Sequence, residues 1–429
     1  MAKWKIIGIM TGNSMDAIDM VLTEFEGESF RDVCGFSKPY TQKERDKINV
    51  LRKRVVLQKI KAKDLQKDAE FLAVHDQYVK GIALAVNEFC VQNNIEKHSV
   101  DAIGFHGKTL DHNPPSSASK TGYYPFTTQM GSAQMLADLT GIPVINDFRS
   151  ALIMNGLEGA PLAAPHNAHI AQKEGDGCYI NAGNTSNVAW IVAEKALQSW
   201  DVGPFNEYID AFVRRYKNAD MDKNGKWGLK GKVLPELWSE IFELCHDFYE
   251  LTPPKSGDPA FYKTEKLFAE VEKKYGNPLQ NETIFCDILH TLEFFAGYLV
   301  AYAVTSTPPE YLTNPHFVLF GGGWLNPVAR QSFEGFILQK LSPLSQHKEK
   351  FQKFYNRLSC VPKIKYSSWG KYMESRLFAD LARYYLENKT WDLPELITSK
   401  KHIVLGNMRF PQAAPVDDFL SKAAYGWQN

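Results

Sequence analysis

Residues 4–25 read WKIIGIMTGNSMDAIDMVLTEF, and this stretch decides the fold. A strand-like apolar run, Trp4–Met10, leads into the small polar residues 11–14, and an alternating run follows from Ala17 to Phe25. Two such runs joined by a short turn predict a β-hairpin. Because small side chains leave the N–H groups of the turn accessible, the turn is suited to bind an anion such as phosphate.

A second hairpin of the same design is predicted at residues 178–192, which read CYINAGNTSNVAWIV. It begins about 170 residues after the first, and we interpret the pair as a weak internal duplication. Two domains are therefore expected, 1–170 and 171–429, with the C-terminal helix free to pack back on the first. Two turns of this kind suit a nucleotide whose phosphates bind between two related lobes, although no Walker A motif is present.

The composition excludes several classes of protein. In 429 residues, 49 Lys and Arg balance 49 Asp and Glu, which argues against a protein whose main task is to bind nucleic-acid backbone. The six cysteines form no C-x-x-C pair, so neither zinc nor a redox dithiol is indicated. The N-terminus lacks a secretory pattern, and the longest apolar run, Phe294–Val304, is shorter than the ~20 residues of a membrane helix. We therefore expect a cytoplasmic protein.

The segment 43–67 is strongly basic, with ten basic and three acidic residues in a helical pattern. A solvated helix face is the favoured interpretation. A docking surface for an acidic partner is the minor alternative.

Three acidic residues are candidates for chemistry, each with a structural alternative. Asp16 follows the first turn, where it could bind Mg²⁺ or cap the turn. Asp201 ends a short apolar segment and could act as a general base, but Asp-x-Gly-Pro is also a good turn sequence. Glu374 begins a strongly helical stretch, where a first-turn charge favours the helix dipole.

Two further features also have both a functional and a structural interpretation. Arg149 could bind a carboxylate with its guanidinium fork, or form an ion pair with Asp147. Gly321–Gly323 follow the strand-like run His316–Phe320, so the backbone there could pass close to a flat ligand, or simply form a flexible turn. The spacing is not that of a dinucleotide fingerprint.

The order of the motifs resembles that of the anhydro-N-acetylmuramic acid kinases over nearly the whole chain, and the related levoglucosan kinase shares the same order. Gly8–Asp16 resembles the opening G-x-M-S-G-T-S-x-D of the family, and Asp201–Asn206 resembles D-T-G-P-G-N. The other matching segments are His106–Thr109, Thr140–Arg149, Gly159–Leu162, Asn181–Asn187, Asp222–Gly225, Pro253–Ser256, Gly321–Pro327 and Met373–Glu374.

The resemblance implies an α/β fold of two lobes with a central interlobe cleft, of the sugar-kinase/actin/Hsp70 (ribonuclease H-like) type. It implies that ATP and Mg²⁺ are used on a 1,6-anhydro sugar, anhydro-N-acetylmuramic acid, to give N-acetylmuramic acid 6-phosphate in cell-wall recycling. The partners expected are the sugar and ATP, with no nucleic acid and no membrane, and a homodimer is in keeping with the family.

The resemblance also implies roles for individual residues. Asp201 matches the family residue that activates the water molecule opening the anhydro ring at C1, while O6 takes the γ-phosphoryl group. The sugar would contact His106, Arg149, Pro161 and Glu374. ATP would contact Thr11, Gly12, Asn13, Ser14, Asp16, Gly183, Asn184, Thr185, Asn187, Gly321, Gly322 and Gly323, with Asp16 also binding the metal.

Several residues depart from the family pattern. Asn13 and Asn184 replace residues of the two phosphate turns, Phe205 replaces a glycine after Asp201, and Lys108 replaces a glutamine. Asp258 stands in a segment where the family has an arginine. Three further hypotheses therefore remain: a kinase for another sugar, a non-catalytic nucleotide- or sugar-binding paralogue, and an interaction module that uses the basic 43–67 helix.

Overall fold

The computed structural model describes residues 2–12, 15, 17–58, 60, 62–193, 195–253, 255–257, 262–307, 309–313, 315–367, 372–394, 396 and 401–412. The chain divides into two compact units. Unit 1 contains Met1–Gly159, Tyr372–Trp391 and Glu395–Asn429, and unit 2 contains Ala160–Lys371 and Asp392–Pro394. The division precedes the expected boundary at residue 170, because helix α7 (Ala164–Glu174) packs on two strands of unit 2.

Unit 1 contains a six-stranded sheet in the order β13-β7-β4-β1-β2-β3. Its first three strands form an antiparallel meander, β4 and β7 run parallel to β1, and β13 pairs antiparallel with β7. A separate two-stranded sheet pairs β5 with β6. The strands are β1 (Lys3–Thr11), β2 (Ala17–Glu26), β3 (Ser29–Pro39), β4 (Ala102–Phe105), β5 (Lys108–Asn113), β6 (Phe126–Met130), β7 (Val144–Asn146) and β13 (Asn407–Arg409).

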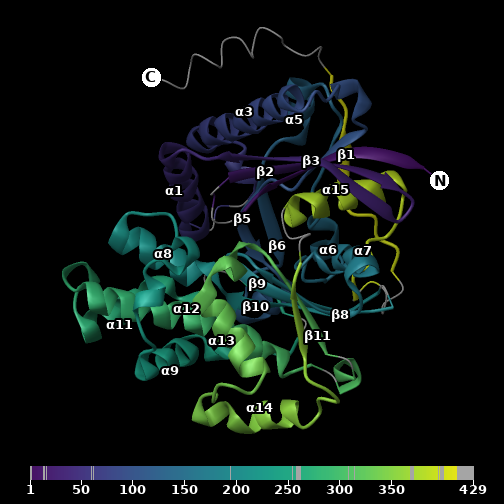
Figure 1. Ribbon diagram of the computed structural model, residues 1–429. Helices are drawn as coiled ribbons and strands as arrows, with labels where there is room; N and C mark the ends of the chain where they lie inside the picture. Colours follow the sequence, from purple (N-terminus) through teal and green to yellow (C-terminus); the bar gives the residue numbers. More distant parts are fainter. Residues whose placement is uncertain are drawn as a thin grey trace. The chain divides into compact units, whose positions relative to one another are not determined.

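The helices of unit 1 pack around this sheet. They are α1 (Gln42–Gln58), α2 (Ala62–Leu65), α3 (Ala69–Gln92), α4 (Pro115–Thr121), α5 (Ala133–Thr140), α6 (Ser150–Met154) and α15 (Met373–Leu386). Helix α15 comes from the far end of the sequence yet packs on β1, β2 and β4, and Figure 1 shows it beside β1.

Two glycines allow this close packing of α15 on the sheet. A Cβ atom at Gly8 of β1 would lie 1.8 Å from the carbonyl oxygen of Ser375, and one at Gly104 of β4 would lie 2.0 Å from that of Phe378. The helix backbone therefore rests directly on the two strands, which fixes the position of every side chain on the inner face of α15.

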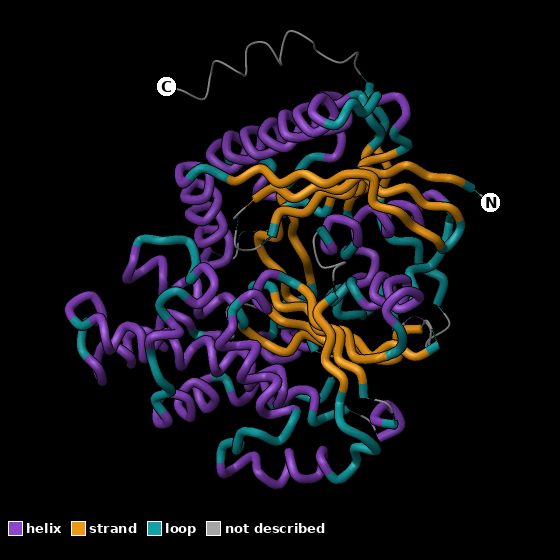
Figure 2. Tube along the Cα trace, in the orientation of Figure 1, coloured by secondary structure: helices purple, strands orange, loops and turns teal. Residues whose placement is uncertain are grey.

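Unit 2 contains a five-stranded sheet in the order β10-β9-β8-β11-β12, drawn as orange strands in Figure 2. Strands β8, β9 and β10 form an antiparallel meander, while β11 runs parallel to β8 and β12 runs parallel to β11. The strands are β8 (Gly177–Ala182), β9 (Thr185–Val192), β10 (Lys195–Pro204), β11 (His316–Phe320) and β12 (Lys363–Tyr366).

The core helix of unit 2 is α12 (Glu282–Val304). It is long and apolar enough to cross a membrane, but 83% of its most apolar window is buried inside the protein. Its burial therefore identifies α12 as a core helix. The other helices of unit 2, besides α7, are α8 (Asn206–Lys217), α9 (Pro235–Leu244), α10 (His246–Tyr249), α11 (Thr264–Tyr275), α13 (Pro327–Ile337) and α14 (Lys348–Tyr355).

The two sheets repeat one plan, as the repeated hairpin predicts. In both sheets, three strands form an antiparallel meander, and two further strands run parallel to the first strand of that meander, on its other side. The order is β3-β2-β1-β4-β7 in unit 1 and β10-β9-β8-β11-β12 in unit 2. Both predicted hairpins are present, as β1–β2 and β8–β9. The expected fold class, an α/β fold of the sugar-kinase/actin/Hsp70 type, is confirmed.

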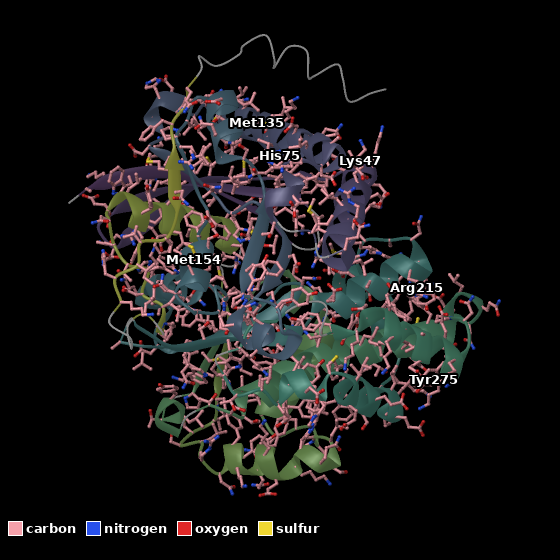
Figure 3. All side chains as sticks on the ribbon, turned by 180° about the vertical axis from the view of Figure 1, so that it is seen from behind. Lys47, His75, Met135, Met154, Arg215 and Tyr275 are labelled. Atoms are coloured by element: carbon pink, nitrogen blue, oxygen red, sulfur yellow. The ribbon has the colours of Figure 1, made fainter. Side chains whose placement is uncertain are left out.

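The basic segment 43–67 lies mainly on α1, whose lysines Lys43, Lys47 and Lys53 are exposed to solvent. Lys47, labelled in Figure 3, donates a hydrogen bond to Gln77 of the neighbouring helix at 3.1 Å. Arg54 forms ion pairs with Asp68 at 2.7 Å and Glu70 at 2.6 Å. These contacts match the favoured interpretation of a solvated helix face.

Candidate active site

Three neighbouring strands of unit 2 place polar side chains in a row. Asn187 of β9 lies directly opposite Asn181 of β8 on one side and directly opposite Asp201 of β10 on the other. Side chains of directly opposed residues project from the same face of a sheet, with Cβ atoms about 4.5–5.5 Å apart. Asn181 and Asp201 are both 7% exposed. The row therefore joins a predicted phosphate turn to the predicted base.

The Asp201 carboxylate is held by the segment Lys255–Gly257. Its Oδ2 accepts a hydrogen bond from the Gly257 N–H at 2.9 Å and one from the Ser256 hydroxyl at 3.3 Å. The Asp201 N–H in turn donates to the Lys255 carbonyl at 2.9 Å. These contacts hold Oδ2 and the backbone of Asp201 in place. The P-P-K-S match was the only sequence signal for this segment, and it did not reveal that the segment holds Asp201.

Lys255 anchors that segment from behind. The side chain is 5% exposed, and its Nζ donates to the carbonyl oxygens of Phe248 and Tyr249, each at 2.9 Å. Burial, together with the positive charge of Lys350, lowers the pKa of Lys255 to about 8, against the opposing effects of Glu250 and Asp201. Lys255 was not among the predicted site residues.

The second phosphate turn, between β8 and β9, rests on the start of α8. The N–H groups of Phe205 and Glu207 donate to the Asn184 carbonyl at 2.8 and 3.2 Å, and the Asn206 N–H donates to the Gly183 carbonyl at 3.1 Å. The Asn184 amide also donates to the Glu207 carboxylate. The asparagine that departs from the family pattern therefore ties its turn to the following helix.

Thr185, the next residue of this turn, is also tethered. Its hydroxyl lies 3.0 Å from that of Tyr262, and a Cβ atom at Gly257 would lie 3.4 Å from its methyl group. The turn therefore lies beside the segment that holds Asp201.

Phe205 does not occupy the site beside Asp201. Its ring is 1% exposed and packs in the core of unit 2, edge to face with Trp324 at 5.0 Å between centroids. Gly323 makes room for it, because a Cβ atom there would lie 2.7 Å from the ring. The departure from glycine at this position thus adds to the core of unit 2.

The glycine loop after β11 lies against the same end of the sheet. Gly321 has a φ of +97°, and a Cβ atom there would lie 2.5 Å from Asn181 Oδ1. A Cβ atom at Gly322 would meet nothing within 4 Å. The predicted residues Gly183, Asn184, Thr185, Asn187, Asp201 and Gly321–Gly323 are therefore gathered at one end of the strands of the unit 2 sheet.

In unit 1, His106 and Arg149 form a directly bonded pair. The Arg149 Nε donates to His106 Nε2 at 2.8 Å, and the Arg149 Nη1 donates to the Gly159 carbonyl at 2.6 Å. His106 Nδ1 lies 2.8 Å from the Gly107 carbonyl, so it carries the proton of the neutral ring. Burial and the adjacent Arg149 hold the pKa of His106 well below its usual value.

The first phosphate turn is tied to the segment that carries His106. The Thr11 hydroxyl donates to the Gly107 carbonyl at 3.4 Å and lies 2.7 Å from the Tyr78 hydroxyl. The Nζ of Lys108 donates to the Gly12 carbonyl at 3.0 Å. Sequence reasoning gave no signal for Tyr78. Asn13, Ser14 and Asp16, including the predicted metal ligand, lie outside the described residues.

Glu374 and Pro161 complete the predicted residues. Glu374 is exposed in the first turn of α15, four residues before Phe378, so both lie on one face of the helix. The Phe378 ring packs on His106 at 4.7 Å between centroids. The structure therefore brings Thr11, Gly12, His106 and Arg149 together within unit 1, and Glu374 lies one helical turn from the Phe378 that packs on His106. Pro161, preceded by a cis peptide bond, belongs to unit 2.

Two histidines of unit 1, the buried His106 and the partly buried His112, predict a dependence of stability on pH. Burial, with the charge of Arg149, lowers the pKa of His112 to about 3 and holds that of His106 well below its usual value. An unfolded histidine titrates near pH ~6.5, so below that pH the unfolded chain takes up protons that the folded unit cannot. Each group should cost about 1.4 kcal/mol of stability per pH unit as the pH falls.

The melting temperature should therefore fall between pH 7 and pH 5, and His112→Gln should reduce the slope of that fall. Scanning calorimetry across this range provides the measurement. Equal slopes for the two proteins would contradict the assignment of a neutral His112 in the folded unit.

The family model described as anhydro-N-acetylmuramic acid kinase matches residues 4–411. The chain is 30% identical over 346 residues to an anhydro-N-acetylmuramic acid kinase of Nitrobacter winogradskyi, which covers 79% of this chain and 84% of that protein. It is 28% identical over 407 residues to one of Saccharophagus degradans, covering 94% and 98%. Among solved structures, the ROK hexokinase from Thermus thermophilus matches 88% of this chain and 99% of that chain, with a TM-score of 0.35 and 13% identity.

Proposed function

The chain belongs to the anhydro-N-acetylmuramic acid kinase family, and on this premise we propose that it opens the 1,6-anhydro ring of anhydro-N-acetylmuramic acid and phosphorylates O6. It is an ATP-dependent sugar kinase whose product would be N-acetylmuramic acid 6-phosphate. We further propose a place in cell-wall recycling, a cytoplasmic location, Mg²⁺ as the metal and a homodimer.

One observation carries the proposal. The Asp201 carboxylate lies in a row with Asn187 and Asn181 on three neighbouring strands. In the reaction, Asp201 would act as general base and take a proton from a water molecule whose oxygen forms a bond to C1 of the sugar. The bond between C1 and O6 breaks, O6 takes the γ-phosphoryl group, and ADP leaves. The donors from Ser256 and Gly257 hold the carboxylate still, which such a base requires.

The sugar would be bound by His106, Arg149, Pro161 and Glu374. Arg149 suits the lactyl carboxylate of the muramic acid, because a guanidinium can bind a carboxylate in a bidentate manner. The neutral His106 orients the guanidinium by accepting its Nε–H. Glu374 is positioned on the same face of α15 as the Phe378 ring that packs on His106.

ATP would be bound by the turns after β1 and β8, with Gly321–Gly323 near adenosine. Phosphoryl transfer depends mainly on positioning and electrostatic stabilisation, for which exposed N–H groups and small side chains are suited. The positive φ of Gly321, which glycine adopts readily, and the open space at Gly322 fit the close approach of a flat group. Mg²⁺ would be bound by Asp16 and the phosphates, because it prefers oxygen ligands.

The test is ADP release by purified protein with ATP, Mg²⁺ and 1,6-anhydro-N-acetylmuramic acid. 1,6-Anhydro-N-acetylglucosamine, which lacks the lactyl group, and levoglucosan serve as comparison sugars. Turnover that is highest with the muramic acid derivative supports the proposal, and a phosphate on O6 in the product identifies the reaction. Turnover with a comparison sugar alone would reassign the substrate, and ATP binding without turnover on any sugar would indicate a binding paralogue.

A further inference from the structure

A buried tyrosine hydroxyl lies against the second phosphate turn. Tyr262 is 0% exposed, and its hydroxyl lies 3.0 Å from that of Thr185, the first residue of β9. Gly257 leaves the space that this hydroxyl occupies, because a Cβ atom at Gly257 would lie 2.2 Å from it. The reaction proposed above gives no role to this hydroxyl, although it lies between the turn and the segment that holds Asp201.

The rest of Tyr262 is anchored in the core of unit 2. Its carbonyl oxygen accepts hydrogen bonds from the Tyr208 hydroxyl and, at 3.4 Å, from the Cys245 thiol. Its ring packs edge to face on that of Phe248, with 6.0 Å between the centroids. Because both the backbone and the ring are held, the hydroxyl is presented to Thr185 from a fixed position.

The number of protons available decides what the two hydroxyls can do together. A hydroxyl has one proton to donate and can accept through its lone pairs, whereas phosphate oxygens only accept. When the Thr185 hydroxyl donates its proton to a phosphate oxygen, it can still accept a hydrogen bond, and the Tyr262 hydroxyl lies at the distance to donate one. Hydrogen bonds that run in one direction along such a chain strengthen one another.

We propose that Tyr262 is a positioning residue for ATP, whose hydroxyl donates to Thr185 Oγ1 and so directs the Thr185 proton to a phosphate oxygen of the nucleotide. The proposal rests on the proposed function, because it requires ATP to bind at the second phosphate turn. Tyr262 acts through Thr185, so the two residues should contribute to the affinity for ATP as one unit.

A double-mutant cycle tests this unit by titration calorimetry with ATP and Mg²⁺. Thr185→Val keeps the shape of the side chain and loses the hydroxyl, so it should bind ATP about tenfold more weakly, because a hydrogen bond to a charged group is lost. Tyr262→Phe keeps the ring and should bind ATP roughly threefold to tenfold more weakly. The double variant should bind ATP no more weakly than Thr185→Val alone.

Two further variants serve as controls. Thr185→Ser keeps the hydroxyl, so it should bind ATP almost as the unchanged protein does and should remain sensitive to Tyr262→Phe. Tyr355→Phe removes another tyrosine hydroxyl of unit 2, which donates to the Phe336 carbonyl at 2.7 Å, and it should leave ATP binding unchanged. Thermal melting should verify that each variant is folded.

The outcomes distinguish the possible failures. If the losses of Thr185→Val and Tyr262→Phe multiply in the double variant, the two residues act independently and the proposal is wrong. It is also wrong if either single variant, once folded, binds ATP as the unchanged protein does. If the unchanged, folded protein binds no ATP, the proposed function itself fails.

Discussion

An Asp201→Asn variant is expected to lose about 10²–10⁴-fold in sugar-dependent ADP release, which is the usual contribution of a positioned general base. Asparagine has the shape of aspartate, and its carbonyl oxygen can accept the same hydrogen bonds from Ser256 and Gly257. The amide cannot take a proton from water, however. The defect should therefore appear in kcat, while the affinity for ATP, measured by calorimetry, stays within a small factor of that of the unchanged protein.

Asp287→Asn provides the matched control. Asp287 is also a buried carboxylate of unit 2, at 5% exposure, and it accepts a hydrogen bond from the Lys232 N–H at 2.9 Å, a contact that asparagine can keep. Sugar-dependent activity should survive this change. If the Asp201→Asn variant kept its activity within about fivefold of that of the unchanged protein, the base would be another group, since removal of a general base costs at least ~10²-fold.

Local sequence patterns were sufficient to predict the hairpins of both units. Their alternating and apolar runs specify strands, and the small residues between them specify turns, so β1–β2 follows from residues 4–25 and β8–β9 from residues 178–192. The strand at His316–Phe320 was predicted for the same reason. The order of the remaining strands was not predicted, because pairing between distant segments leaves no local pattern, and the family resemblance implied only the fold class.

The contacts that build the site could not be predicted in this way. Arg149 meets His106 across 43 residues of sequence, and Gly257 meets Asp201 across 56. A bulge in β10 between Asp201 and Gly203 sets which side chains face Asn187. The position of the Phe205 ring could not be predicted either, because only the packing shows that the ring fills a space left by Gly323.

A Lys255→Met variant is expected to lower kcat by about 10–100-fold with little change in ATP affinity. Methionine has a similar length but no donor, so the Phe248 and Tyr249 carbonyls lose their partner and the Lys255–Gly257 segment is no longer anchored. The carboxylate of Asp201, which that segment holds, then loses its alignment, and small misplacements of a catalytic group can cost about 10²-fold. Because Lys255 acts through Asp201, it is a positioning residue.

The dependence on pH separates this role from general destabilisation. With a pKa of about 8, Lys255 loses its charge above that pH, the bonds to the two carbonyls weaken, and kcat of the unchanged protein should decline. Over the same range the unfolded chain keeps this proton up to about pH 10.4, so by itself this group makes the folded state more stable as pH rises from 8. Activity should therefore fall without a matching fall in melting temperature. The decline near pH 8 should be absent from Lys255→Met, and a variant that kept it would show that another group titrates there.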